Sequence, residues 1–296
     1  MTTAPILVLG GSGQVATCLM AQGEGLGLVL RGRPEFDFEQ IDRIPGLLAE
    51  IGPRMIINAA AYTAVDKAES ESDYADRANH LGPAILAEYA RTHGIPLIHI
   101  STDYVFDGAK RSAYVESDPT GPTGVYGRTK LAGEQAVLAR GAQAIILRTA
   151  WVYAAEGKNF VRTMLGAAQR VPKLRVVADQ IGCPTAAADL AAAILAIARK
   201  IDSEGWKPEF GGVFHASGTG EASWYQFAVE IFRLAAAHGR PMPEVEPIAT
   251  TDWPTPAQRP ANSRLDCSKL ESVFGLRLPR WQKSLATVVD RICAVE

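Results

Sequence analysis

The chain is 296 residues long, which is enough to bury a large core in one large domain or in two closely joined ones. Hydrophobic residues make up 47% of it and the formal net charge is −2. Without a bulk basic surface to attract nucleic acid or an anionic membrane, the composition favours an enzyme over a nucleic-acid-binding or membrane-surface protein.

The cysteines and the apolar runs exclude further classes of protein. Cys18, Cys183, Cys267 and Cys293 lie far apart and form no Cys-x-x-Cys pair, so neither a zinc site nor a disulfide framework is indicated. The opening residues lack the basic and apolar regions of a signal peptide, and no apolar run approaches the roughly 18 residues of a membrane-spanning helix. We therefore expect free thiols in a reducing, cytoplasmic environment.

Apolar runs alternate with helical patterns through the first two thirds of the chain, which is typical of an α/β fold with a doubly wound, Rossmann-type parallel sheet. The strands predicted in chain order are 6–9, 27–30, 55–59, 97–100, 144–147 and 175–177. The predicted helices are 15–20, 41–51, 72–92, 125–138, 160–168 and 187–200. Beyond about residue 203 the alternation stops, and proline and tryptophan become more frequent around a predicted helix at 224–238.

This change of pattern indicates two domains. We expect a dinucleotide-binding domain over residues 1–150, with its sheet continued by about 175–202. A smaller, discontinuous substrate-binding domain is expected over residues 151–174 and 203–296. In a sheet of this kind ligands bind at the carboxyl ends of the strands, so the functional residues are expected there.

A glycine-rich segment directly follows the first predicted strand. Gly11-x-Gly13-x-x-Ala16, in the run that begins at Gly10, fits the dinucleotide-binding fingerprint. One glycine allows the tight turn, another lets a pyrophosphate approach the backbone, and a small residue lets the helix pack on the strand. The helix that follows would direct its N–H groups at the phosphates. The alternative is an ordinary glycine-rich turn.

Two arginines follow the second predicted strand, where an NAD-selective site usually has a carboxylate. Arg31 and Arg33 could pair with the 2′-phosphate of NADPH, whereas a carboxylate would bind a free 2′-hydroxyl group. We therefore predict NADPH as the cofactor. NADH is the alternative, because Glu35 and Asp37 follow closely and both arginines could instead be solvated.

Tyr126 and Lys130 are four residues apart, which places them on one face of a helix. A free tyrosine has a pKa of about 10 and exchanges protons poorly at neutral pH unless a nearby cation stabilises the phenolate. Lys130 can supply that cation, and the hydroxyl group of Thr102 or Ser101 could hold a carbonyl oxygen while Tyr126 protonates it. These residues predict a site that transfers a proton and a hydride together. The alternative is a surface tyrosine beside a solvated lysine.

Small and aromatic residues near the strand ends are further candidates. Ala59, Ala60 and Ala61 would let a cofactor lie close to the backbone, or would simply pack tightly. Asn79 could hydrogen-bond to backbone near the site. Trp151 follows the fifth predicted strand, where it could stack on a sugar or fill the core.

A proline-constrained loop near the end of the chain offers polar groups. Arg259 and Asn262 carry guanidinium and amide groups suited to the phosphates and hydroxyls of a nucleotide sugar. A structural turn with solvated arginines is the alternative. The five histidines show no metal-ligand spacing, so no metal is predicted.

Several motifs, taken together, are specific to a known family. They are Gly10-x-x-Gly13-Gln14-Val15 and the segments 58–69, 101–106, 125–134, 148–153, 159–160, 179–185 and 254–265. On these motifs the chain resembles the extended short-chain dehydrogenase/reductases over nearly its whole length. The resemblance implies a Rossmann-type fold and a dTDP-linked nucleotide sugar as substrate. The implied reaction is reduction of the C4 ketone of dTDP-4-dehydro-6-deoxy-L-mannose by NAD(P)H, giving dTDP-L-rhamnose.

The resemblance also implies roles for individual residues. Tyr126 would donate the proton, Lys130 would bind the nicotinamide ribose and adjust Tyr126, and Thr102 would hydrogen-bond the substrate oxygen. The residues that fall at sugar-nucleotide contacts are Thr102, Asp103, Tyr104 and Trp151. The residues that match cofactor contacts are Gly13, Gln14, Val15, Asp37, Phe38, Ala61, Tyr62 and Thr63.

The chain departs from the family at the positions of a shared metal. Some members form a magnesium-linked dimer through glutamates. This chain has Cys18 just after the glycine loop and Ala186, Ala187 and Ala188 where another glutamate is expected. We therefore predict no bound metal, and a monomer or a metal-independent homodimer.

Three other functions are compatible with the same fold. A sugar-nucleotide dehydratase would have a glutamate after Asp103, where this chain has Tyr104, which argues against dehydration. A non-catalytic NAD(P)-binding regulatory subunit, like the partner of methionine adenosyltransferase, would not need Tyr126, Lys130 and Thr102. A reductase of another nucleotide-linked 4-keto-deoxysugar stays open, because the choice of epimer depends on pocket geometry.

Overall fold

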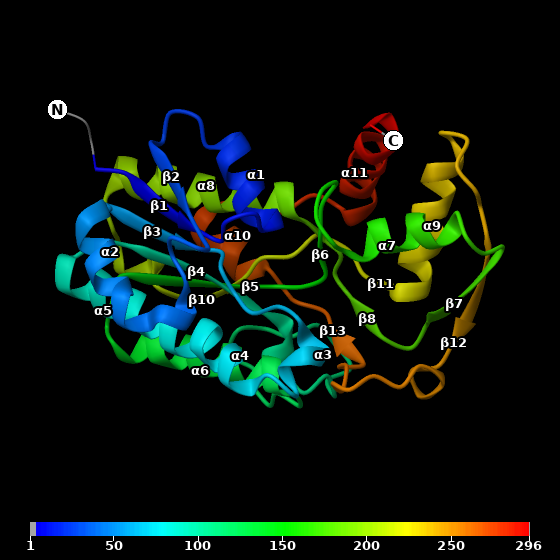
Figure 1. Cartoon of the computed structure of the whole chain (residues 1–296), viewed down its shortest axis with the longest axis horizontal. Coiled ribbons are helices and arrows are strands. Elements are labelled where there is room, and N and C mark those ends of the chain that lie inside the picture. Colours follow the sequence, from blue (N-terminus) through cyan, green and yellow to red (C-terminus); the bar gives the residue numbers. More distant parts are fainter. Residues whose placement is uncertain (1–3, 296) are drawn as a thin grey trace.

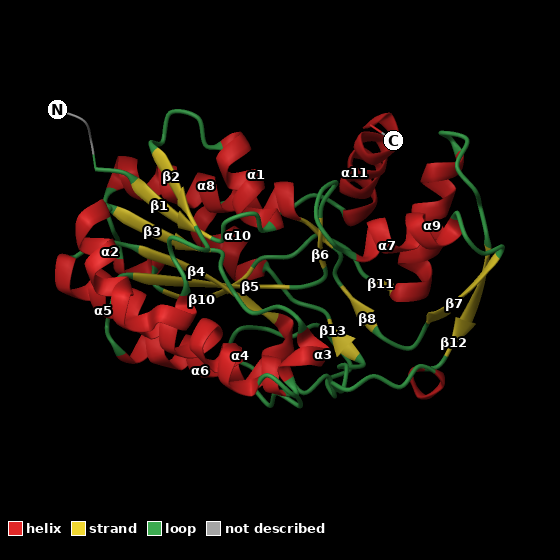
Figure 2. Ribbon diagram, viewed as in Figure 1, coloured by secondary structure: helices red, strands yellow, loops and turns green. Residues whose placement is uncertain are grey.

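The computed structural model describes residues 4–295, and a parallel sheet of six strands forms its centre (Figures 1 and 2). The strands, in order across the sheet, are β10 (Gly212–His215), β5 (Ala144–Thr149), β4 (Leu97–Thr102), β3 (Met55–Asn58), β1 (Ile6–Leu9) and β2 (Leu28–Arg31). All four residues of β1 are apolar and buried, as expected of a strand that is covered on both faces. The chain starts inside the sheet and winds out to both edges, which confirms the doubly wound α/β fold.

Two layers of helices cover the sheet, one on each face (Figure 2). Ile6 and Val8 pack with the helices of one layer, whereas Leu7 and Leu9 pack with those of the other, because neighbouring side chains of a strand point to opposite faces. The first layer contains α1 (Gln14–Gln22), α8 (Ala187–Glu204) and α10 (Ser268–Phe274). The second contains α2 (Ile44–Ile51), α5 (Gly82–His93) and α6 (Val125–Ala139).

A small lobe, on the right in Figure 1, has a core of its own. Its helices are α7 (Phe160–Ala168), α9 (Trp224–Ala236) and α11 (Trp281–Val295). Short strands pair as β7 (Lys173–Val177) with β12 (Glu244–Ile248), β6 (Val152–Tyr153) with β9 (Thr185–Ala186), and β8 (Ile181–Gly182) with β11 (Ala222–Ser223) and β13 (Asn262–Ser263).

The remaining elements are short helical segments. They are η1 (Phe38–Arg43), α3 (Val65–Ala68), α4 (Ser72–Asp76), η2 (Arg77–Leu81), η3 (Asp103–Val105), η4 (Pro208–Phe210) and η5 (Thr250–Asp252). The predicted helix at 72–92 is α4, the π-helical turn η2 and α5 in succession, and the one at 41–51 begins as the 3-10 helix η1. Within residues 4–295, no helix combines the length and the apolarity needed to cross a membrane.

The sixth strand of the central sheet differs from the predicted one. Strand 175–177 lies in β7, which pairs with β12 of the small lobe, so the expectation that it continues the central sheet is wrong. The sixth place is taken by β10, which pairs with β5. The sequence pattern missed β10 because it lies beyond residue 203, where the alternation had stopped. The division of the chain into two domains stays a prediction.

A buried ion pair joins α6 to the sheet. The guanidinium group of Arg148 in β5 donates two hydrogen bonds to the carboxylate of Glu134 in α6, at 2.9 and 2.6 Å. Only 5% and 2% of the two side chains are exposed. Because an unpaired charge in the interior is strongly unfavourable, this pair fixes α6 on the sheet.

Replacing Glu134 with glutamine is expected to lower the free energy of unfolding by about 3–5 kcal/mol, because the Arg148 charge stays buried without a counter-charge. Urea denaturation followed by circular dichroism measures the change. Glu88→Gln is the matched control, since Glu88 pairs with Arg91 on the exposed surface of α5 and its loss should have a much smaller effect. Equal losses in the two variants would contradict this role of the buried pair.

Candidate active site

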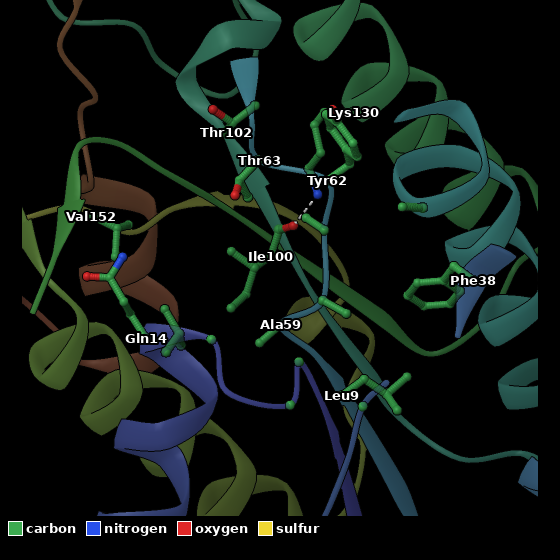
Figure 3. Close-up of a pocket in the computed structure, with 18 of the residues that line it drawn as sticks. Leu9, Gln14, Phe38, Ala59, Tyr62, Thr63, Ile100, Thr102, Lys130 and Val152 are labelled. Atoms are coloured by element: carbon green, nitrogen blue, oxygen red, sulfur yellow. Dashed lines mark hydrogen bonds between the residues drawn. The ribbon is translucent and has the colours of Figure 1, made fainter. Parts of the chain in front are cut away.

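The carboxyl ends of the central strands open into a cavity of about 680 Å³ (Figure 3). Most of the predicted site residues line it: Gly10, Gly13, Gln14, Val15, Arg31, Arg33, Asp37, Phe38, Ala60, Ala61, Tyr62, Thr63, Thr102, Asp103, Tyr104, Tyr126, Lys130 and Trp151. Two of the predicted residues, Arg259 and Asn262, are not part of its wall. Residues from six separate segments of the chain thus meet where ligands bind in sheets of this kind.

The loop between β1 and α1 requires its glycines. Gly10 and Gly11 have φ angles of +144° and +51°, which other residues rarely adopt. A Cβ atom at Gly10 would lie 3.2 Å from the backbone of Ala59, so the ends of β1 and β3 approach closely. Helix α1 begins at Gln14 without a side-chain cap, which leaves N–H groups of its first turn unsatisfied. Such a helix N-terminus is suited to a phosphate.

Two guanidinium groups lie at the rim of the cavity, near the end of β2. Arg31 donates to the carbonyl of Leu30 at 2.9 Å, and Arg33 lies 3.9 Å from the carboxylate of Glu39 with 75% of its side chain exposed. Asp37 accepts the backbone N–H of Glu39 at 3.0 Å, which caps η1. Since neither guanidinium is held in a close ion pair within the described residues, both can pair with an incoming phosphate.

The segment after β3 is held by two buried asparagines. Asn58 Oδ1 accepts the N–H of Ala60 at 3.1 Å. Asn79, in the π-helical turn η2, accepts the N–H of Tyr62 at 2.8 Å and donates to the carbonyl of the same residue at 3.1 Å. The expected hydrogen bond from Asn79 to backbone near the site is therefore confirmed, and it keeps this wall of the cavity in place.

Helix α6 brings Tyr126 and Lys130 to the cavity. The carboxylate of Glu69 accepts the N–H of Val125 at 2.8 Å, so a residue far back in the chain caps the start of the helix. The ring of Tyr126 packs edge-on against Tyr104, with the centroids 5.5 Å apart. These contacts fix the first turn of α6, from which the phenol group extends into the cavity.

Burial changes the proton affinities of Tyr126 and Lys130 in opposite directions. It raises the pKa of Tyr126 above its ordinary value, which the neighbouring Thr102 hydroxyl group partly opposes. It lowers the pKa of Lys130 to about 8, which the charge of Glu134 partly opposes. Lys130 Nζ donates to the carbonyl of Ile100 at 2.6 Å. At neutral pH the phenol therefore keeps its proton and the amine is mostly charged, which suits a tyrosine proton donor.

Thr102 and Asp103 lie at the end of β4. The Thr102 hydroxyl group donates to Asp103 Oδ1 at 2.9 Å and accepts the N–H of Tyr104 at 3.2 Å. The Asp103 side chain is buried, and this burial raises its pKa to about 7. The cavity thus contains a carboxyl group that titrates close to neutral pH.

Trp151 forms a rigid part of the cavity wall. Its φ of +49° is strained for a bulky residue. The ring stacks on Trp224 with the centroids 3.4 Å apart, and Nε1 donates to Ser263 Oγ at 3.1 Å. Trp224 in turn donates to Gln180 Oε1 at 3.2 Å. These contacts with the small lobe hold the strained conformation, so the indole keeps one position.

The loop with Arg259 and Asn262 is held by an ion pair and by buried hydrogen bonds. Asn262 is buried and donates to the carbonyls of Lys110 and Ser112 at 2.6 and 2.8 Å. Arg259 pairs with Asp66 at 2.7 Å. Arg259 is therefore not the solvated arginine of the alternative, and the amide donors of Asn262 are already used. Contact of these two residues with a substrate stays a prediction.

The predicted absence of a metal stays a prediction. Within residues 4–295, no three His, Cys, Asp or Glu side chains lie close enough together to hold a metal ion. The four cysteines are free thiols, which agrees with the expectation from their spacing.

The sequence matches the family described as RmlD substrate binding domain over residues 4–293. The chain belongs to this RmlD family. A dTDP-4-dehydrorhamnose reductase from Sinorhizobium fredii is 47% identical over 285 residues, which are 96% of each chain. A probable dTDP-4,6-dihydroxy-2-methyloxan-3-one 4-ketoreductase from Streptomyces antibioticus is 41% identical over 267 residues, which are 90% of this chain and 87% of that protein.

A solved structure shows the same architecture. The dTDP-4-dehydrorhamnose reductase of Bacillus anthracis, in complex with NADP, is similar over the full length of both chains with a TM-score of 0.88 and 32% sequence identity. Together with membership of the RmlD family, this similarity confirms the resemblance that the motifs indicated and the Rossmann-type fold.

Sequence reasoning missed several residues of this RmlD-family site. Trp224 carries no local signal, and Ser263 lies in one of the family motifs, but the contact of both with Trp151 depends on the arrangement of the small lobe. Glu69 lies in one of the family motifs, yet its role as the cap of α6 becomes visible only in the structure. Each of these residues acts by positioning another residue of the cavity wall.

Asp103→Asn is expected to stabilise the protein at pH 8 and to have little effect at pH 4. The folded-state pKa of Asp103 is raised from about 4 to about 7, so the folded protein binds this proton more tightly and loses stability as the pH rises between these values. The expected gain at pH 8 is on the order of 4 kcal/mol. Urea unfolding of the wild-type protein and of Asp103→Asn at pH 4 and pH 8 measures this gain in stability. A gain that does not depend on pH would exclude a buried titration at Asp103.

Proposed function

We propose that this chain is an NADPH-dependent oxidoreductase that reduces the C4 ketone of dTDP-4-dehydro-6-deoxy-L-mannose and forms dTDP-L-rhamnose. The observation that carries the proposal is the meeting of Tyr126, Lys130 and Thr102 in one cavity with the glycine loop. The relatives named dTDP-4-dehydrorhamnose reductase support the substrate, and the complex of the Bacillus anthracis protein with NADP supports the cofactor.

The cavity offers a group for each charged part of NADPH. The N–H groups of residues 10–15 would bind the pyrophosphate, and Arg31 and Arg33 would bind the 2′-phosphate. Lys130 would bind the nicotinamide ribose. The bound cofactor supplies the hydride for the reduction. NADH can serve in its place with weaker binding, since it lacks the phosphate that the arginines recognise.

Tyr126 would donate the proton that completes the reduction. The ketone carbon gains a hydride and the ketone oxygen gains the phenol proton, so that the C=O bond becomes a secondary alcohol. The Lys130 cation would stabilise the phenolate that remains. The Thr102 hydroxyl group would hold the substrate oxygen beside the phenol by turning its one donor away from Asp103 Oδ1. The other residues proposed to contact the sugar are Asp103, Tyr104 and Trp151.

A second candidate is the reduction of another nucleotide-linked 4-keto-deoxysugar. The relative from Streptomyces antibioticus, which is named as a 4-ketoreductase of a different sugar, favours it. A non-catalytic regulatory subunit is disfavoured, because it would not need the phenol, the amine and the hydroxyl group that meet in the cavity.

We further propose that the enzyme works in the cytoplasm as a monomer or a metal-independent homodimer. The free thiols support a reducing compartment. Cys18 and Ala186–Ala188, at positions where metal-linked relatives are expected to have glutamates, support assembly without a metal.

Tyr126→Phe is expected to lower kcat by about 100-fold or more, because it removes the proton donor. The dissociation constant of NADPH should change little, since the ring is retained. Stopped assays of NADPH consumption and a fluorescence titration of NADPH binding measure the two quantities. Retained turnover would remove Tyr126 from the mechanism.

The substrate is tested with dTDP-4-dehydro-6-deoxy-L-mannose made in situ from dTDP-glucose by a dehydratase and an epimerase, with Tyr126→Phe as the control. NADPH oxidation that requires the epimerase and yields dTDP-L-rhamnose would support the proposal. Oxidation without the epimerase would favour the second candidate. Tight NADPH binding without oxidation would favour a regulatory subunit.

The double variant Arg31→Ala/Arg33→Ala is expected to raise KM for NADPH by about tenfold or more and to leave KM for NADH nearly unchanged, because NADH has no 2′-phosphate. Steady-state kinetics with each cofactor measure both constants. Arg43→Ala is the matched control, since Arg43 is an exposed arginine of η1 outside the cavity wall. Equal effects on the two cofactors would contradict the assignment of the 2′-phosphate to these arginines.

A further inference from the structure

Three buried polar side chains lie in a row beside the cavity, and the proposed mechanism uses only one of them. Lys130 is 1% exposed, and Asn58 and His99 are fully buried. His99 Nε2 lies 3.4 Å from Lys130 Nζ, and His99 Nδ1 lies 3.0 Å from Asn58 Nδ2. The row runs from β3 through β4 to α6, so it connects the end of β3 and the interior of β4 to the helix that carries Tyr126.

The backbone fixes the orientation of the Asn58 amide group. The N–H of Ala60 can only donate, and it lies 3.1 Å from Asn58 Oδ1. If the amide were turned round, its NH₂ group would face this N–H, and a backbone donor would lose its partner. Asn58 therefore presents its NH₂ group to His99.

This orientation determines which nitrogen of His99 carries the proton. Burial and the neighbouring Lys130 hold the pKa of His99 well below its usual range, so the ring is neutral and has a single N–H. Because the Asn58 NH₂ group donates to Nδ1, that nitrogen is the acceptor and the proton is on Nε2. The Nε2–H group therefore faces the amine of Lys130.

We propose that Asn58 and His99 are positioning residues for Lys130. They keep the lone pair of the His99 ring away from the Lys130 ammonium group. The ammonium group can then donate its hydrogen bonds to the Ile100 carbonyl and to groups bound in the cavity. This inference rests on the proposed reductase function, because it takes Lys130 as the residue that binds the nicotinamide ribose and stabilises the Tyr126 phenolate.

The Lys130 ammonium group has three N–H donors, and the His99 tautomer decides how many of them reach the cavity. One donates to the Ile100 carbonyl at 2.6 Å. A lone pair on His99 Nε2 would take a second and draw the amine away from the cavity, whereas an N–H takes none. Two donors therefore stay available for ribose hydroxyls and for the phenolate of Tyr126.

The contact between His99 Nε2 and Lys130 Nζ also makes protonation of Lys130 less favourable. The Nε2–H group presents its positive end to the amine, which acts in the same direction as burial, and burial lowers the pKa of Lys130 to about 8. Glu134, on the same helix, opposes this shift, and the other titratable groups that line the cavity with Lys130 include Tyr126 of α6, Asp103 and Tyr104 of η3 and Tyr62 of the segment after β3. The His99 tautomer therefore contributes to the pH above which Lys130 loses its charge and activity falls.

Nitrogen-15 NMR of the full-length protein labelled at its histidines measures the tautomer directly, with His99→Gln to assign the His99 signals. Long-range proton–nitrogen correlations distinguish a protonated from an unprotonated ring nitrogen. We expect an unprotonated Nδ1 and a protonated Nε2 at neutral pH, with and without NADPH. A protonated Nδ1 would overturn the inference and leave the reductase proposal untouched, since the measurement needs no sugar substrate.

Asn58→Asp is designed to reverse the tautomer. A carboxylate accepts hydrogen bonds from both the Ala60 N–H and His99 Nδ1, so the proton moves to Nδ1 and a lone pair faces Lys130. We expect the dissociation constant of NADPH to rise about tenfold, as for the loss of one hydrogen bond. The alkaline limit of kcat/KM should move to higher pH, because the lone pair and the added carboxylate both stabilise the Lys130 charge.

The matched control is Asn262→Asp, which places a carboxylate at another buried asparagine that also accepts a backbone N–H, that of Arg264, but lies outside the cavity wall. It should leave the His99 signals as they are in the wild-type protein. If Asn58→Asp fails to fold, the His99 tautomer measured in the wild-type protein still shows whether the inference is right. The positioning role is wrong if Asn58→Asp reverses the tautomer without changing NADPH affinity or the alkaline limit, or if Asn262→Asp shifts both equally.

Discussion

The geometry of the site depends on how helix α6 is attached to the central sheet. This helix carries both Tyr126 and Lys130, and its contacts with β4 and β5 include buried hydrogen bonds and an ion pair besides the apolar ones. A purely apolar helix face can shift by a fraction of a turn at modest cost. Here such a shift would separate Glu134 from Arg148 in the interior, where an unpaired charge is strongly unfavourable. One orientation of α6 is therefore selected, and the phenol and the amine are fixed relative to the strand ends.

Close packing on the other side of α6 extends this constraint to the cofactor side of the cavity. A Cβ atom at Gly133 would lie 2.0 Å from the carbonyl oxygen of Asn79, so only glycine allows the helix to approach η2 this closely. The wide π-helical turn of η2 carries the Asn79 side chain, which binds both backbone polar groups of Tyr62. One residue thus packs against the helix of the proposed proton donor and also holds the wall formed by the segment after β3.

Features set by neighbours in the chain could be predicted from the sequence, and features set by distant partners could not. The apolar run of β1 and the four-residue spacing of Tyr126 and Lys130 are local, and both predict structure directly. The place of β10 depends on β5, and that of β7 on β12, and no local pattern encodes either partner. The same applies to the site, because Trp151 is held by Trp224 and the amide of Asn262 is used by carbonyl groups far back in the chain.

The burial that fixes these groups also determines their chemistry. Desolvation raises the pKa of Asp103 to about 7 and lowers that of Lys130 to about 8, so a carboxyl group and an amine that ordinarily titrate far apart both do so near neutral pH. It also keeps Tyr126 protonated. A lysine surrounded by water would already have its donors satisfied, whereas a buried amine with one backbone acceptor has donors left for a ligand. Exclusion of water between α6 and β4 is therefore the common cause of both the geometry and the proton affinities.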